Sequence, residues 1–314
     1  MIQSIWEEIR REFRHGNMVT RLIIANVSVF VLVWLIYLLM LLTLGHSGNH
    51  HTYFDKMIEY LCMPADWKHL LLRPWSLFTY MFLHQEPLHI FFNMIMLYWF
   101  GRIVGDFIGD HRVLPIYLIG GLAGALLFFV FANAFFDANA IMLGASAAVM
   151  ALAVAAAALA PDYLMRLILL GDVKLKYVVA VLLILDLVAI GKESNTGGHV
   201  AHLGGALIGG LFVQQLRAGN DWSAPINRLL DKLLQLFRSI KGQPRKRGPH
   251  VVYRNPVKAT TEAGGKQRRK PSEDSNGLSY QEQLDAILDK IKQSGYNSLS
   301  TEEKEFLFNA SNRK

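Results

Sequence analysis

Cysteine is almost absent from this sequence, since Cys62 is the only one among 314 residues. A single cysteine excludes an intramolecular disulfide and a zinc site built on several cysteines. The H-E-x-x-H motif of zinc proteases does not occur either. Nothing in the sequence requires a metal or an organic cofactor, and we predict neither.

Charged residues are missing from long stretches, although they make up 18% of the chain. Residues 22–45 hold no Lys, Arg, Asp or Glu; this run is too long for a signal peptide, and no small-x-small cleavage site follows it. Five or six such stretches have a bilayer-spanning length, so we predict an all-α membrane protein, a bundle of six transmembrane helices. The predicted spans are residues 22–45, 88–108, 113–134, 144–160, 176–191 and 200–216.

The basic residues are distributed as expected for a membrane protein rather than for a nucleic-acid-binding one. The net charge is +7, but 19 of the 32 Lys and Arg follow residue 216, beyond the last predicted span. If both termini are cytoplasmic, nine basic residues of the N-terminal segment and loops lie on that side and four on the other. We therefore predict a multi-pass protein of the cell (plasma or inner) membrane with cytoplasmic termini and no nucleic-acid partner.

The sequence after the last span predicts two further helical parts. Residues 217–240 are predicted to form an amphipathic juxtamembrane helix, packed either on protein or on the membrane surface. Two capping boxes, Ser279-x-x-Glu282 and Ser300-x-x-Glu303, predict a helical hairpin with an interaction or regulatory role. The predicted parts are a cytoplasmic segment 1–21, a membrane domain 22–216, the juxtamembrane helix 217–240, a basic flexible linker 241–278, and a small helical cytoplasmic extension 279–314.

Polar residues inside a bilayer are costly, so each one in a predicted span needs a physical reason. Ser146 opens the fourth span, where unpaired N–H groups and the positive end of the helix dipole would stabilise an oxyanion. The simpler interpretation is a serine that caps the helix. His202 lies one turn into the sixth span, where a histidine is either a satisfied structural residue or a base. His199, one turn nearer the surface, is the weaker candidate.

Further polar residues lie at the start of the second span and within the fifth. His89 and Asn93 are four residues apart, share a helix face and can both donate hydrogen bonds, which suits an oxyanion hole. Metal binding by His84, His89 and a later histidine is the alternative, weakened by the missing H-E-x-x-H motif. Asp186 has no second mid-span aspartate beside it, which argues against an aspartyl protease. We expect Asp186 to hydrogen-bond to a neighbouring helix, and a role in substrate gating is the other interpretation.

Small residues would let the fourth and sixth spans approach closely. Residues 145–160 contain ten alanines, and Gly205-x-x-x-Gly209 has the small-xxx-small pattern of close helix pairs. Such packing would bring Ser146 within hydrogen-bond reach of His202. A nucleophile, a base and hydrogen-bond donors at one depth form the pattern of a hydrolase.

Taken together, these motifs resemble those of the rhomboid intramembrane proteases over roughly residues 18–216. The motifs that carry the resemblance are Gly144-Ala145-Ser146, Ala201-His202-x-x-Gly205-x-x-x-Gly209, and the ordered set His84, His89 and Asn93. The resemblance implies a six-helix bundle with a water-filled cavity, and substrates that are single transmembrane segments in the lipid bilayer.

The resemblance also implies a role for each matching residue. Ser146 would be the nucleophile and His202 the general base of a dyad without a carboxylate third member. Asn93, His89 and the Ser146 backbone N–H would form the oxyanion hole. The residues expected to support the site are Gly144, Met150, His84, Gly205 and Gly209.

Three positions depart from the family's usual pattern. Ala147 stands where a glycine commonly follows the nucleophile, and Met150 where a tyrosine often stacks on the base. The family's Trp-Arg pair appears as Trp75-Ser76, with Arg73 just before it. The alternative function is therefore a catalytically silent relative that binds transmembrane segments. A transporter would show internal repeats with broken helices, which are not found, and the sequence predicts no particular oligomeric state.

Overall fold

The computed structural model describes residues 7, 10–12, 16–45, 48–135, 137–167, 171–190, 195–240 and 280–311. The basic linker predicted at residues 241–278 lies outside the described residues, as do Ser279 and part of the N-terminal segment. The chain divides into two compact units, Met1–Lys246 and Arg247–Lys314.

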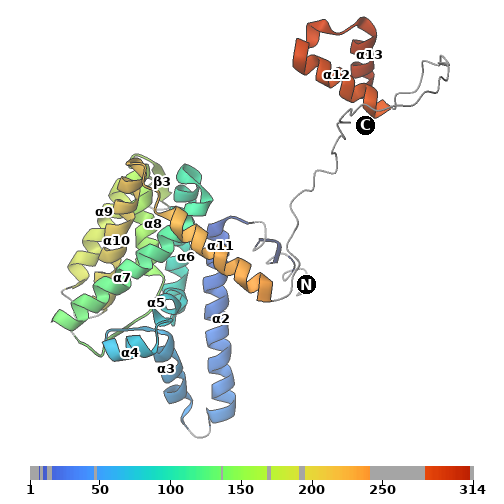
Figure 1. Ribbon diagram of the computed structural model, residues 1–314. Helices are drawn as coiled ribbons and strands as arrows, with labels where there is room; N and C mark the ends of the chain where they lie inside the picture. The colour runs from blue at the N-terminus through green and yellow to red at the C-terminus, as the bar shows by residue number, and fades with distance from the viewer. Residues whose placement is uncertain are drawn as a thin grey trace, which may run out of the picture. The chain divides into compact units, whose positions relative to one another are not determined.

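The first unit is mostly helical, and a helix lies at each of the six positions predicted for a span (Figure 1). These helices are α2 (Met18–Leu44), α6 (Pro87–Ile108), α7 (Val113–Phe135), α8 (Ser146–Leu159), α9 (Leu175–Ala189) and α10 (Thr196–Arg217). Among the described residues, three helical stretches are long and apolar enough to cross a membrane, namely Met18–Leu44, Pro87–Ile108 and Asp110–Phe135, while α8 is apolar but shorter. The helical fold is confirmed, and the count of six spans remains a prediction.

Short elements that the sequence pattern did not predict connect these helices. They are α3 (His50–Leu61), β1 (Met63–Pro64), α4 (Trp67–Leu72), α5 (Ser76–Thr79), η2 (Tyr80–Phe82), η3 (Asp110–Arg112), β2 (Ile141–Met142), β3 (Leu164–Leu167) and β4 (Gly171–Lys174). Both strand pairs are antiparallel, β1 with β2 and β3 with β4. In the first pair Met63 lies opposite Met142, so the chain after α3 holds the segment that leads into α8.

Helix α8 lies in the middle of the first unit and packs against α6, α7 and α10 (Figure 1). Nine of its 14 residues are buried, on every side of the helix. A helix that is apolar all round belongs in the interior, because it has no face suited to water. The alanine-rich sequence therefore accounts for the central position of α8.

Backbone contact between α8 and α10 occurs at the two glycines of the small-xxx-small motif. A side-chain carbon at Gly205 would overlap the carbonyl oxygen of Ala147, and one at Gly209 would overlap that of Ala151. Only glycine allows helices to approach this closely. The predicted close packing of the fourth and sixth spans is confirmed at these positions.

Buried tyrosine hydroxyls tie the segment before α6 to α7. Tyr80 donates to the Gly121 carbonyl at 2.6 Å, and Tyr117 donates to the Met81 carbonyl at 2.8 Å. A buried hydroxyl left without a partner would cost about 1–3 kcal/mol, so these bonds specify one position for η2. The backbone of Tyr80 in turn contacts the loop before α8.

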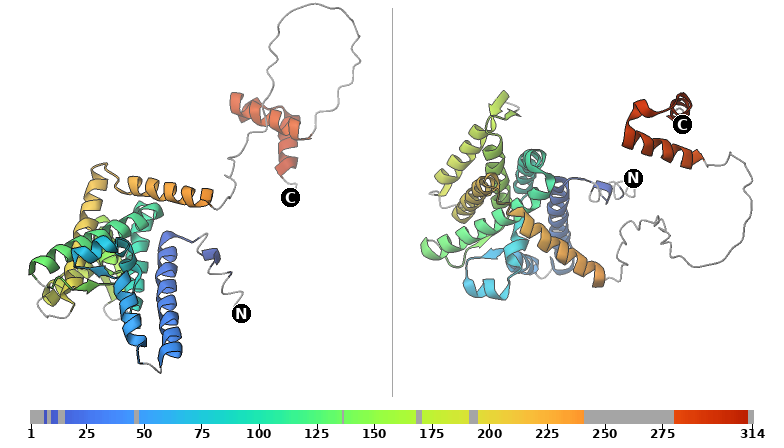
Figure 2. Two further views of the ribbon diagram at one scale, coloured as in Figure 1. Left: turned by 60° about the horizontal axis from the view of Figure 1, so that its bottom comes forward. Right: turned by 45° about the horizontal axis from the view of Figure 1, so that its top comes forward.

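Helix α11 (Ser223–Ile240) follows α10 and runs across one end of the helices of the first unit (Figure 2). An ion pair anchors its start, since Arg112 contacts the Asp221 carboxylate at 2.7 Å. Leu229 and Leu233 of α11 are 58% and 43% exposed. The helix is present, and the contact of its apolar side with protein or with the membrane surface stays a prediction.

The second unit contains α12 (Tyr280–Ser294), η5 (Tyr296–Ser298) and α13 (Thr301–Ser311). The capping box predicted at Ser300 is present: the Glu303 N–H donates to the Ser300 hydroxyl at 3.2 Å, and the Ser300 N–H donates to the Glu303 carboxylate at 2.7 Å. Lys290 of α12 binds Glu303 at 2.8 Å and links the two helices. Ile287 of α12 is buried, whereas Leu288 is exposed.

Candidate active site

The segment before Ser146 is held in an extended turn that requires glycine. Gly144 has a φ of 122°, which is strained for any residue with a side chain. A Cβ at this position would also lie 2.9 Å from the imidazole Cε1 of His89. The Gly144 N–H donates to the Tyr80 carbonyl at 2.9 Å, so the turn is fixed to η2. Ala145 comes next, and Ser146 is the first residue of α8.

The N-terminus of α8 carries no side-chain cap. Ala145 occupies the capping position and offers no acceptor, so the backbone N–H groups of the first turn stay open. The Ala145 N–H points at His84 Nε2 over a long 3.4 Å. Burial lowers the pKa of His84 to about 4, and the neighbouring His89 contributes to this shift. The His84 ring is therefore neutral near pH 7 and can accept this hydrogen bond. The interpretation of Ser146 as a plain helix cap finds no hydrogen bond to support it.

His202 and Asp186 face one another across α10 and α9. The Nδ1 atom of His202 lies 2.8 Å from Asp186 Oδ1, and Nδ1 of His199 lies 2.8 Å from the same oxygen. The expectation that Asp186 bonds to a neighbouring helix is therefore confirmed. The resemblance gave His202 no carboxylate partner, whereas the structure places one within hydrogen-bond distance.

His89 and Asn93 enter the same region from α6. Asn93 is buried, and one amide N–H donates to the His89 carbonyl at 2.9 Å within the helix. The amide has a second N–H, which this bond leaves available. The His89 ring lies beside the Gly144 backbone and meets the His84 ring edge-on, with centroids 5.1 Å apart.

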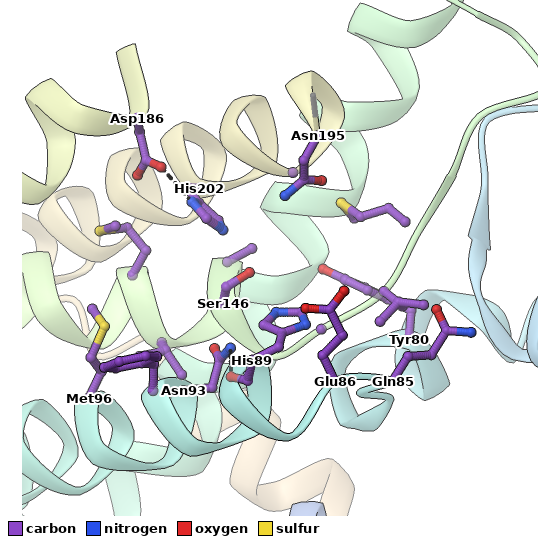
Figure 3. A pocket seen from close by; sticks show the side chains of 18 of the residues that line it. Tyr80, Gln85, Glu86, His89, Asn93, Met96, Ser146, Asp186, Asn195 and His202 are labelled. Atoms are coloured by element: carbon purple, nitrogen blue, oxygen red, sulfur yellow. Dashed lines mark hydrogen bonds and ion pairs between the residues drawn. The ribbon is translucent and has the colours of Figure 1, made fainter. Parts of the chain in front are cut away.

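These side chains surround a cavity of about 710 Å³. Figure 3 shows Ser146 and His202 pointing into it, with His202 between Asp186 and Ser146, and His89 and Asn93 below them. All four predicted oxyanion-hole and dyad residues line this cavity, together with Gly144 and Met150. No hydrogen bond joins the described Ser146 and His202 side chains in this state. Catalytic hydrogen bonds are often long without substrate and tighten in the complex.

Asp186, His199 and His202 are also the group of described residues that could hold a metal ion. Their ligand atoms lie within 4.8 Å of one another. The 2.8 Å separations are ordinary hydrogen-bond distances, so direct bonds account for the cluster without an ion. The alternative metal site on His84 and His89 gains no third ligand among the described residues.

The structure shows which contacts are made at the positions that depart from the family pattern. The Ala147 methyl group occupies the space that a side chain at Gly124 of α7 would fill, so a larger residue after the nucleophile is accommodated by a glycine opposite. Arg73 and Trp75 both hold Tyr60: the guanidinium lies 4.8 Å from its ring centre, and the indole N–H donates to its carbonyl at 3.1 Å. Met150 is buried and lines the cavity.

Comparison with known proteins finds two matching families. Residues 72–218 match the Rhomboid domain model, and residues 276–313 match a family of unknown function, DUF6576. Presenilin-associated rhomboid-like protein A, mitochondrial, from Danio rerio is 28% identical over 134 residues. That match covers 42% of this chain and 35% of the relative, so the chain spans about a third of the relative's length.

The apolar helices and the domain match indicate a mostly helical membrane protein. Beside its buried central helix lies the cavity that His89, Asn93, Ser146 and His202 line. The chain therefore contains a rhomboid domain over residues 72–218, and it is similar to a rhomboid-like protein.

Proposed function

We propose that this chain is an intramembrane serine endopeptidase that cuts peptide bonds in or near the transmembrane segments of other membrane proteins. The observation that carries the proposal is the position of Ser146. It lies at the uncapped N-terminus of a buried helix and shares a cavity with His202. The match of residues 72–218 to the Rhomboid domain model supports the same class of reaction.

In the proposed reaction, Ser146 is the nucleophile and His202 is the general base. The Ser146 hydroxyl proton moves to Nε2 of His202 while Oγ attacks the substrate carbonyl carbon. The proton then passes from Nε2 to the leaving amine, and an acyl-serine remains. Water attacks the acyl group through the same base and restores Ser146. The hydrogen bond between the two side chains would form as substrate enters.

The negative charge of the tetrahedral intermediate needs hydrogen-bond donors. We assign the oxyanion hole to the Ser146 N–H, the Asn93 amide and the His89 ring, which all border the cavity. The open first turn of α8 supports this assignment, because its N–H groups and dipole favour a negative charge. Removing one such donor typically costs about 10²–10³-fold in kcat.

The shape of the cavity supports a transmembrane segment as substrate. Its border includes the exposed apolar residues Leu88 and Phe92 of α6 and Leu185 of α9. An apolar helix can contact such residues from the lipid without exposing its own side chains to water. The carbonyls of an intact helix are used in backbone bonds, so we expect cleavage in segments that unwind readily.

The orientation with both termini in the cytoplasm is also proposed, on the nine-to-four distribution of basic residues. The name of the relative places that protein in mitochondria, whereas for this chain we propose the cell membrane.

The test is cleavage of a generic transmembrane-segment substrate by purified protein in liposomes. Ser146→Ala and His202→Ala are each expected to abolish cleavage, while Ser28→Ala, an exposed serine on α2, retains it. Cleavage by Ser146→Ala at the wild-type rate would contradict the proposal. Folded wild-type protein that binds the segment without cutting it would support the silent alternative.

A further inference from the structure

Helix α9 holds one carboxylate on its inward face. Leu175, Val179 and Asp186 are its buried residues, and their spacing of four and seven places them on one side of the helix. Leu185 and Leu187, on either side of Asp186, are 59% and 57% exposed, whereas Asp186 is 7% exposed. A carboxylate held inside a membrane helix bundle is costly unless a partner binds it, so its contacts require an explanation.

The partners of Asp186 determine where the His202 proton lies. An ionised carboxylate only accepts hydrogen bonds, so a ring nitrogen 2.8 Å from it must donate. The Nδ1 atom of His202 therefore carries the proton, and Nε2 is left with a free lone pair. That ring edge is the one directed toward the cavity and Ser146 (Figure 3).

We infer that Asp186 is the positioning residue of the proposed site, so that the working unit is Ser146, His202 and Asp186 rather than a dyad. The inference rests on the proposed function and adds a residue to it. Asp186 holds His202 in the tautomer that can accept the serine proton, and it stabilises the imidazolium that forms. The proton moves from Ser146 Oγ to His202 Nε2, and Asp186 stays ionised throughout.

His199 shares this carboxylate without touching the cavity. Both histidines use Asp186 Oδ1, while Oδ2 is buried and has no hydrogen-bond partner among the described residues. His199 is absent from the cavity lining, and its bond therefore serves to hold α9 against α10. His199 therefore has a role in helix packing, whereas His202 is the base that Asp186 positions.

The first experiment compares kcat and KM of wild type with Asp186→Asn in liposomes. Asparagine keeps the shape of the side chain but removes the charge that an imidazolium needs. We expect kcat to fall about 10²-fold or more, as for the equivalent change in other serine proteases, with KM within about twofold. Asp106→Asn, the same change at an exposed aspartate of α6 outside the cavity, is the matched control and should keep wild-type kcat.

His199→Gln distinguishes positioning from packing. A fall in kcat smaller than that of Asp186→Asn is expected, because the bond from Asp186 to His202 remains. Equal losses in both variants, or unchanged kcat in Asp186→Asn, would overturn the inference. Failure of the proposed function itself is recognised separately, because wild type would then not cleave at all.

A second measurement reads the His202 ring in wild-type protein and uses a variant only to assign its signals. In wild-type protein with ¹⁵N-labelled histidine, NMR should show the neutral His202 ring protonated on Nδ1, with its signals assigned by their loss in His202→Asn. A His202 ring protonated on Nε2 instead would overturn the inference, whatever the cleavage rates are.

Discussion

Gly205 is the position where packing and the proposed chemistry are most closely coupled, because it faces the residue after Ser146. A methyl group at Gly205 would overlap the Ala147 oxygen and lie 2.9 Å from the Ala147 carbonyl carbon. Carbon atoms in contact prefer about 3.5–4.0 Å, so α8 and α10 must separate by roughly 1 Å in Gly205→Ala. Overpacking of this kind costs about 1–3 kcal/mol of stability.

The same displacement would move Ser146 relative to His202. A misplacement of about 1 Å can reduce a catalytic rate about 10²-fold, so Gly205→Ala should lose cleavage well before it loses its fold. The assay is kcat/KM in liposomes together with thermal unfolding in detergent.

Gly210→Ala is the matched control on the same helix. Its added methyl group meets only a side-chain carbon of Val154 at 3.7 Å, an ordinary contact. We expect this variant to match wild type in both assays. Equal activity of Gly205→Ala and Gly210→Ala would refute the reasoning that backbone contact between α8 and α10 sets the position of the nucleophile.

Two further predictions concern single side chains. Asn93→Ala should lower kcat about 10-fold or more through loss of an oxyanion donor, whereas Asn139→Ala, at an exposed loop position, should not; equal rates would remove Asn93 from the oxyanion hole. Burial raises the pKa of Cys62 to about 12, and the nearby Glu59 contributes to this shift. Iodoacetamide at pH 8 should therefore label Cys62 only after unfolding. Labelling of the folded protein at the rate of a free thiol would contradict the burial of Cys62.

The sequence was sufficient to predict features that depend on local pattern. Long charge-free runs predicted the helix positions, and Gly205 with Gly209 predicted the contact with the alanine-rich helix. The capping box at Ser300 needs only residues three apart, and it is present. In each case one stretch of sequence carries the whole physical reason.

Features that depend on the rotation of one helix against another could not be predicted. The sequence marked Asp186 as unusual, but only the packing of α9 on α10 shows that it meets both His199 and His202. The β1–β2 pair was not predicted for a different reason. Two-residue strands have no periodicity, and their partners are far apart in the chain.

The compensation at Ala147 likewise depends on a distant residue. The nucleophile motif alone shows only that alanine replaces glycine at position 147. The matching space is provided by Gly124 on another helix, which no spacing within the motif reveals.

The most direct test of the central claim is covalent labelling with a fluorophosphonate, followed by mass spectrometry of the modified peptide. We predict a single adduct on Ser146 in folded wild-type protein and none in Ser146→Ala, with Ser28→Ala labelled as wild type. An adduct on another serine, or no adduct on folded protein, would contradict the claim that Ser146 is an activated nucleophile.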